Sequence, residues 1–296
     1  FDYITDGVLA RHPVDILYIN NPRDLKLFQS ILTKLNLDSS HLKLTGLPLL
    51  DSSFNEKPPL TNKNTICFAG QPTVPNNKKG KTYILERLIQ VAEKFPYQKI
   101  YLKPRQRPDQ LNEHKLKHHY EKTLTKLKET RKIPHNFSIT YEPILSLLQK
   151  TDCFLSLSST AILESLNMKI PTGVISDLGF RDKLGTPIFL DSGITISFDE
   201  ILEGKKPTNE SINKTWLQNF MLSDGRNTER LFKFVDDMVD KQQLTSKMVS
   251  PKESFHVNLT SSYENYKVQI PPPLIEPPKS DKKPSKIRKI IESFSR

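Results

Sequence analysis

Short apolar runs alternate with longer amphipathic stretches through the middle of the chain, from residue 65 to residue 191. The runs at 65–70, 99–103 and 152–157 have the length and residue types of buried strands. Between them, segments such as 82–95 place apolar residues on one face at helical spacing. Regular alternation of strands and helices predicts an α/β fold with a doubly wound, Rossmann-like parallel sheet.

The first part of the chain repeats this pattern on a smaller scale. Apolar runs at 15–20 and 41–48 flank an amphipathic stretch at 23–35, which predicts strand, helix and strand. A polar stretch with two adjacent prolines follows and predicts a linker. The pattern therefore divides the chain into the end of a first, incomplete α/β domain (1–51), a linker (52–64), a larger α/β domain with C-terminal helices (65–244) and a tail (245–296).

Three charged or polar stretches of the larger domain give weaker patterns. The basic residues 78–81 predict a loop before the helix that starts near residue 82. The segment 112–131 is highly charged with few apolar anchors, so we expect an exposed helix or lid. Residues 198–240 predict helical structure.

A turn of three hydroxyl side chains, Ser158, Ser159 and Thr160, joins a predicted buried strand to the following helix. A helix N-terminus offers unpaired N–H groups and a partial positive charge, so such a turn can bind phosphate. Glu164 follows about one helical turn later, where a carboxylate can accept hydrogen bonds from ribose hydroxyls. Ser and Thr also cap helices whatever the function of the protein, so a purely structural cap stays an alternative.

Other polar side chains follow the ends of two more predicted strands: Gln71 and Thr73 after one, Lys103 and Arg105 after the next. In open parallel sheets, ligands bind beyond the carboxyl ends of the strands. We therefore expect these side chains to share one cleft with the hydroxyl turn. Lys103 and Arg105 are candidates to hold phosphates, and Gln71 and Thr73 to contact a nucleotide. A solvated strand end and an ordinary turn are the respective alternatives.

Composition narrows the classes of partner. The chain has 296 residues, only 36% of them hydrophobic, and a net charge of +11, which favours anionic partners. Cys67 and Cys153 lie in apolar runs and predict buried, reduced thiols. His114, His118 and His119 have helical spacing, but no matching carboxylate or cysteine pattern accompanies them, so no metal is expected. The sequence lacks a basic, aromatic-rich motif of the RNA-binding kind, so nucleic acid is not an expected partner.

The order of these features resembles the C-terminal half of a GT-B glycosyltransferase. Gly46-Leu47-Pro48 is similar to the junction that ends the acceptor domain in many such enzymes. Ser158-Ser159-Thr160-Ala161, with Glu164 behind it, is similar to their nucleotide-binding signature. The hydroxyl-rich turn resembles that of sialyltransferase-like and Kdo-transferase-like members, which use CMP-sugars to build capsule or lipopolysaccharide glycans.

Residues 68–75 and 177–180 also look like a group of uncharacterised bacterial glycosyltransferase-like proteins, and the resemblance covers roughly residues 6–240. One departure is Lys103-Pro104-Arg105, which stands where CMP-sugar enzymes often carry His-Pro. A fixed cation can replace that histidine electrostatically. Asp6, before Gly7, is similar to the acidic residue that supplies the catalytic base in sialyltransferase-like enzymes. An ordinary Asp-Gly turn is the alternative.

The resemblance implies a GT-B-like fold with part of a preceding α/β domain. It implies a glycosyltransferase that moves sialic acid or Kdo from a CMP-sugar onto a surface glycan in capsule or lipopolysaccharide biosynthesis, without metal or cofactor. A UDP- or GDP-sugar donor, or a non-catalytic nucleotide-sugar-binding homologue, is the alternative. The expected partners are a nucleotide-sugar and a glycan or lipid-linked glycan acceptor, in the cytoplasm or at the inner face of the plasma membrane.

The tail from residue 245 is polar, then Pro-rich, then basic, and we expect most of it to be disordered. Within 285–296, apolar residues recur at one-face helical spacing among lysines and arginines. A basic amphipathic helix on a tether can lie on an anionic bilayer, so a membrane surface is a further expected partner. A solvated tail, or a helix that docks on its own domain, is the alternative.

Overall fold

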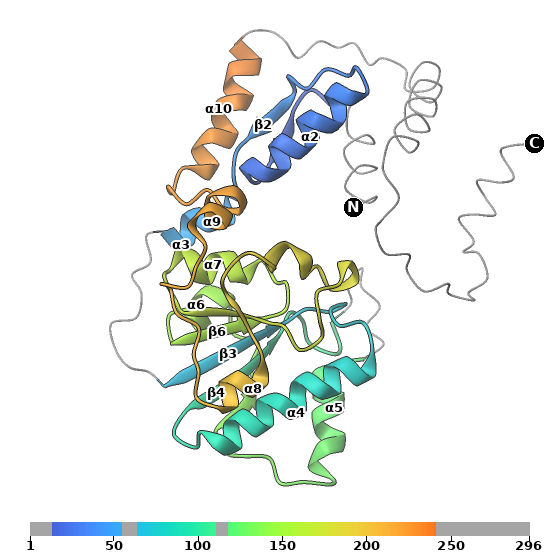
Figure 1. The fold of residues 1–296 in the computed structure, drawn as a ribbon, viewed down its shortest axis with the longest axis vertical. Helices are drawn as coiled ribbons and strands as arrows, with labels where there is room; N and C mark the ends of the chain where they lie inside the picture. Colours follow the sequence, from blue (N-terminus) through green and yellow to red (C-terminus); the bar gives the residue numbers. More distant parts are fainter. Residues whose placement is uncertain (1–13, 55–63, 111–117, 241–296) are drawn as a thin grey trace, which may run out of the picture. The chain divides into compact units, whose positions relative to one another are not determined.

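The computed structural model describes residues 14–54, 64–110 and 118–240 (Figure 1). Asp6, His114 and the tail with its basic segment 285–296 lie outside the described residues. The predictions made for them therefore stay predictions. Within the described residues, no helix combines the length and the apolar character needed to cross a membrane.

A six-stranded parallel sheet organises the larger part of the described chain. Its order is β5 (Phe137–Ile139), β4 (Lys99–Pro104), β3 (Thr65–Gly70), β6 (Cys153–Ser156), β7 (Thr172–Ile175) and β8 (Thr195–Ile196). The chain winds from β3 outward to β5, then returns to the other side of β3 and winds outward again. The predicted doubly wound α/β fold is confirmed, and its topological switch point lies between β3 and β6.

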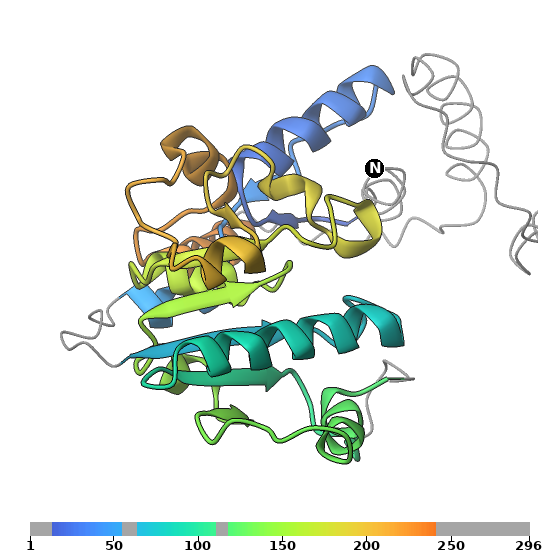
Figure 2. The ribbon, with the colours of Figure 1, turned by 60° about the horizontal axis from the view of Figure 1, so that its bottom comes forward.

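Both faces of this sheet are covered by helices. Ile66 and Phe68 of β3 face a core shared with α4 (Lys78–Lys94), α5 (Tyr120–Lys128) and α8 (Phe198–Leu202). Cys67 and Ala69 alternate with them and face α6 (Ile144–Leu148), α7 (Ala161–Asn167) and α9 (Lys214–Phe220). Figures 1 and 2 show α4 lying along the sheet. Burial on both faces explains the continuous apolar strands, each large side chain contributing about 1.5–3 kcal/mol.

A smaller parallel pair, β1 (Leu17–Ile19) and β2 (Leu42–Leu44), is joined by α2 (Pro22–Lys34) as predicted. Asn21 caps α2, its side-chain oxygen accepting a hydrogen bond from the Asp24 N–H at 2.8 Å. The β1–β2 pair is followed by the short helix α3 (Leu49–Phe54).

The last described helix, α10 (Asn227–Asp240), is bonded to this first segment. The Asp51 carboxylate on α3 accepts hydrogen bonds from the backbone N–H groups of Asn227 at 3.0 Å and Thr228 at 2.6 Å. Arg230 donates from Nε to the Thr45 carbonyl at 3.1 Å. These bonds keep the pKa of Asp51 below its usual value although burial opposes them.

Several expected element boundaries were wrong. The first three residues of the predicted linker, 52–54, belong to the end of α3, a helix in which Leu50 and Ser53 are buried. The basic stretch 78–81 is no loop but the first turn of α4, because Asn77 caps the helix by accepting from the Gly80 N–H at 2.7 Å. Residues 198–240 were expected to be helical, and they form three helices, α8, α9 and α10, separated by non-helical stretches.

The charged segment after residue 112 was expected to be an exposed helix or lid. Its described helix, α5, begins with a Tyr120 side chain that is only 2% exposed and belongs to the main core. The last strand, β8, was not predicted at all. The thiols behave as expected: Cys67 and Cys153 are buried and free.

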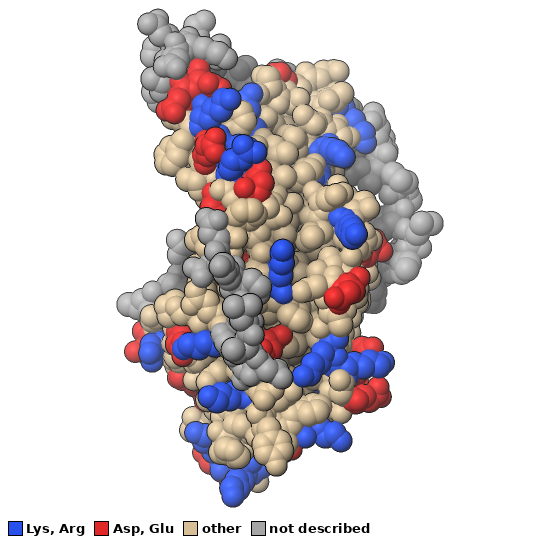
Figure 3. Space-filling model, turned by 90° about the vertical axis from the view of Figure 1, so that its left-hand side faces the viewer, with Lys and Arg blue, Asp and Glu red and all other residues tan. Residues whose placement is uncertain are grey.

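Surface charge is mixed on the face shown in Figure 3, where basic and acidic side chains are interspersed rather than gathered into one basic patch. The net charge of +11 is thus not concentrated on this face.

Candidate functional site

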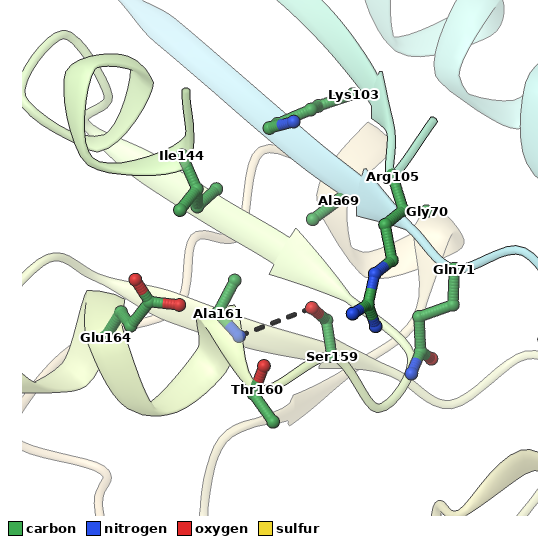
Figure 4. Close-up of a pocket in the computed structure, with 10 residues that line it drawn as sticks. All are labelled: Ala69, Gly70, Gln71, Lys103, Arg105, Ile144, Ser159, Thr160, Ala161 and Glu164. Atoms are coloured by element: carbon green, nitrogen blue, oxygen red, sulfur yellow. Dashed lines mark hydrogen bonds between the residues drawn. The ribbon is translucent and has the colours of Figure 1, made fainter. Parts of the chain in front are cut away.

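A cavity of about 230 Å³ lies at the carboxyl end of the central strands (Figure 4). Its lining includes the predicted residues Gln71, Lys103, Arg105, Ser159, Thr160 and Glu164. The remaining lining residues are small or apolar: Ala69, Gly70, Ile144 and Ala161. Strand-end side chains that are distant in sequence therefore meet in one place, as the sequence predicted.

Strand register explains this convergence. Ala69 near the end of β3 is paired with Lys103 on β4 and with Ser156 on β6. The cations that end β4 and the hydroxyl turn that follows β6 must therefore lie on either side of β3. Gly70 also lines the cavity, and the position requires glycine because a Cβ atom there would approach Tyr120 Cε2 to 2.8 Å.

The two cations of the cavity lack acidic partners. Lys103 is half-buried, and burial lowers its pKa. Arg105 is exposed, and Figure 4 shows its guanidinium group pointing toward Ser159. Among the described residues, neither side chain forms an ion pair with a carboxylate. This uncompensated positive charge suits an anionic ligand, and the low dielectric around a half-buried lysine strengthens the attraction.

Glu164 brings a buried carboxylate to the opposite side of the same space (Figure 4). The residue is only 8% exposed, and no hydrogen bond to its carboxylate is formed by any described residue. Burial raises its pKa. A buried carboxylate without donors is costly, so a ligand that supplies hydroxyl donors would relieve that cost.

Helix capping explains only part of the hydroxyl turn. Ser159 Oγ accepts a hydrogen bond from the Ala161 N–H at 3.3 Å, a local bond of the structural kind. Thr160 holds the N-cap position of α7, yet its hydroxyl forms no cap hydrogen bond within the described chain. The Thr160 hydroxyl thus remains available to a ligand in the cavity.

Ser158 has a different partner from the one predicted for it. Its hydroxyl donates to Gln71 Oε1 at 2.8 Å, while Gln71 Nε2 donates to the Ser158 carbonyl at 3.3 Å. This reciprocal pair ties the loop after β3 to the turn after β6. Ser158 is not among the residues that line the cavity, so its contact with phosphate stays a prediction.

Thr73 and Asp6 are the two further candidates. Thr73 is exposed and outside the lining of the cavity, and Asp6 lies outside the described residues. His119 is buried and caps α5: Nδ1 accepts from the Glu121 N–H at 3.1 Å, and Nε2 lies 2.9 Å from the Gln106 carbonyl oxygen. Among the described residues, no three or more His, Cys, Asp or Glu side chains gather as a metal site would require.

The lining residues to which the sequence assigned no contact with a ligand are Ala69, Gly70, Ile144 and Ala161, although Ala69, Gly70 and Ala161 lie in the motifs that carry the family resemblance. Their position was the available signal, since Ala69 and Gly70 end β3 and Ala161 begins α7. Small residues there leave room for a ligand close to the backbone.

Comparison with solved structures shows the class of fold. The chain is similar to a UDP-N-acetylglucosamine 2-epimerase from Listeria monocytogenes, with 12% sequence identity and a TM-score of 0.50 over 77% of this chain and 61% of that one. It is also similar to the wall teichoic acid polymerase TagF, with 13% identity and a TM-score of 0.50 over 80% of this chain and 61% of that one. The chain thus has the GT-B architecture and spans less than two thirds of either structure's length.

The family is shown by the sequence itself. The chain belongs to the family described as "Putative glycosyltransferase (DUF6716)", which matches residues 2–236. Comparison with curated proteins finds no match. The predicted glycosyltransferase class is therefore confirmed at the level of the family.

Proposed function

We propose that the cavity is the donor site of a glycosyltransferase, which binds a nucleotide-sugar and passes its sugar to a glycan acceptor. The observation that carries this proposal is that two cations, Lys103 and Arg105, and the buried Glu164 line one cavity, and that no described residue forms an ion pair or a side-chain hydrogen bond with their charged groups. A nucleotide-sugar can bind to both kinds of group, since its anionic phosphates suit the two cations and its ribose hydroxyls can donate hydrogen bonds to the carboxylate. Arg and Lys side chains form charge-assisted hydrogen bonds with phosphate oxygens.

The transfer step assigns a role to each side of the cavity. The acceptor hydroxyl oxygen attacks the anomeric carbon, the bond from that carbon to the phosphate oxygen breaks, and the nucleotide leaves with the electron pair. Lys103 and Arg105 would stabilise the negative charge that develops on this phosphate. Asp6 remains the proposed base that takes the proton of the acceptor hydroxyl. Because two side-chain cations can neutralise the leaving group, we expect transfer to continue in EDTA.

The donor is proposed as a CMP-sugar of sialic acid or Kdo, for capsule or lipopolysaccharide synthesis. The hydroxyl-rich turn, with Thr160 unoccupied by capping, supports this choice. A UDP- or GDP-sugar is the second candidate, because two cations at the end of β4 suit the two phosphates of a nucleoside diphosphate.

Calorimetric titration with CMP, UDP and GDP tests the proposal and separates the two donors. Arg105→Gln should weaken binding of the preferred nucleotide by about 10- to 150-fold, the value of one charge-assisted hydrogen bond. Arg107→Gln is the matched control, because Arg107 is two residues away and outside the lining. The donor-site proposal is wrong if no nucleotide binds or if both variants bind like the wild type.

A second assay separates an enzyme from a non-catalytic homologue. Release of free nucleotide from CMP-, UDP- and GDP-sugars, with and without glycan acceptors, measures turnover directly. Tight nucleotide binding without turnover in a chain that includes the complete acceptor side would indicate a nucleotide-sugar-binding protein instead.

A further inference from the structure

Lys81 is a buried cation on α4 outside the cavity lining. Its residue exposure is 2%, although lysine is almost never buried unless it is paired. Among the described residues no carboxylate forms an ion pair with it. Its Nζ atom instead donates to the Pro72 carbonyl at 2.7 Å and to the His118 carbonyl at 2.8 Å, and lies 5.4 Å from the centre of the Tyr120 ring.

The Pro72 carbonyl belongs to the loop that brings Gln71 into the cavity, and the His118 carbonyl lies beside a residue that is hydrogen-bonded to the segment carrying Arg105. Pro72 directly follows Gln71, which lines the cavity. His118 directly precedes His119, whose Nε2 atom lies 2.9 Å from the carbonyl oxygen of Gln106. Nδ1 of His119 accepts from a backbone N–H, so Nε2 carries the proton and donates to Gln106. Gln106 in turn directly follows Arg105.

We infer that Lys81 is a positioning residue of the donor site. One ammonium group fixes the backbone at Pro72 and at His118, and it thereby sets where Gln71 stands directly and where Arg105 stands through the His119–Gln106 bond. This inference rests on the proposed function of the cavity. Within the described chain, Lys81 forms no hydrogen bond or ion pair with a side chain that lines the cavity, so its effect on a bound nucleotide passes through the two carbonyls and the His119–Gln106 bond.

A buried lysine is a costly way to fill space. Burial lowers the pKa of Lys81 to about 8, so the folded chain holds this charge less readily than the unfolded chain does. An apolar side chain of similar length would fill the same volume without that penalty. Three directed N–H donors, however, can tie two separate loops to one point, which an apolar side chain cannot.

The test is a double-mutant cycle on the whole chain with the nucleotide among CMP, UDP and GDP that the wild type binds best. Lys81→Met should raise the Kd about tenfold, while Lys79→Met, on an exposed residue of the same helix turn, should leave it unchanged. In the Lys81→Met background, Arg105→Gln should then raise the Kd only a few-fold, because Arg105 is already displaced.

If Lys81 were purely structural, the fold-increases in Kd caused by Lys81→Met and by Arg105→Gln would multiply in the double variant. That result, or an unchanged Kd in Lys81→Met, overturns the inference while the donor-site proposal stands. Absence of nucleotide binding in the wild type overturns both. If Lys81→Met does not fold, the same double-mutant cycle is measured with Lys81→Arg or Lys81→Gln in its place. If none of the three folds, Lys81 is a residue of the fold and the inference is wrong.

Discussion

Replacing Glu164 with glutamine separates the effect of the carboxylate on the stability of the folded protein from its effect on nucleotide binding. The residue is 8% exposed, and no described residue donates a hydrogen bond to its carboxylate. Glutamine keeps the shape of the side chain and removes the charge. The variant should therefore be more stable than the wild type when no nucleotide is present, and weaker in nucleotide binding.

The stability gain depends on pH. Because burial raises the pKa of Glu164, the folded chain keeps this proton at pH values where the unfolded chain has already released it. Stability therefore falls as the pH rises from the ordinary carboxyl pKa through the raised one, and it stays lower above that window. Glu164→Gln removes the loss, which we expect to be about 1 kcal/mol at pH 7, and leaves stability near pH 4 unchanged.

Thermal unfolding measures this gain as a shift in Tm of about 2–4 °C at pH 7. Calorimetric titration of the same variant should show the preferred nucleotide weakened by about 10- to 150-fold, since hydrogen bonds from ribose to a charged acceptor contribute about 1.5–3 kcal/mol. Glu203→Gln is the matched control, because the Glu203 side chain is 68% exposed and should change neither quantity.

The opposite pattern would refute the reasoning. If Glu164→Gln lowers the Tm of the nucleotide-free protein and binds nucleotide normally, the carboxylate is a structural group with donors in the folded state. If stability rises and affinity is unchanged, Glu164 is strained but does not contact the ribose.

Two further predictions concern charge. Burial lowers the pKa of Lys103, so nucleotide affinity should begin to fall at a lower pH than it would with a lysine of ordinary pKa. Lys103→Gln should flatten this part of the plot of affinity against pH. Identical plots for the wild type and the variant would show that Lys103 does not hold phosphate. The tail should bind anionic but not neutral vesicles in co-sedimentation at low salt, each Lys or Arg near the surface contributing about 1 kcal/mol. A chain that ends at Pro278 should lose this binding, and equal sedimentation of both chains would exclude a membrane role for residues 285–296.

The strands and the location of the site were predictable because both follow from local patterns. The apolar run of β3 can be recognised in the sequence, and so can the strand end at which Lys103 and Arg105 stand. Parallel pairing then forces strand ends to meet at one edge, whatever the loops between them do.

The rest depends on contacts between distant residues. Lys81 looks like part of a basic loop, and only its bonds to Pro72 and His118 explain why it is buried. Tyr120 is likewise buried by packing that a charged local sequence hides. The two-residue β8 is defined by its pairing with β7, so no periodic pattern could reveal it.

The bonds between α10 and the first segment have a consequence for exchanging parts between relatives. Asp51 supplies the acceptor for the first N–H groups of α10, so residues 227–240 belong structurally with residues 14–54 although the whole six-stranded sheet separates them in sequence. A chimaera that swaps donor specificity would therefore need two crossover points, one after α3 and one between α9 and α10. A single crossover after residue 54 would bring in a foreign α10 against the native Asp51, and a mismatch there would appear as lost stability with no change in the cavity.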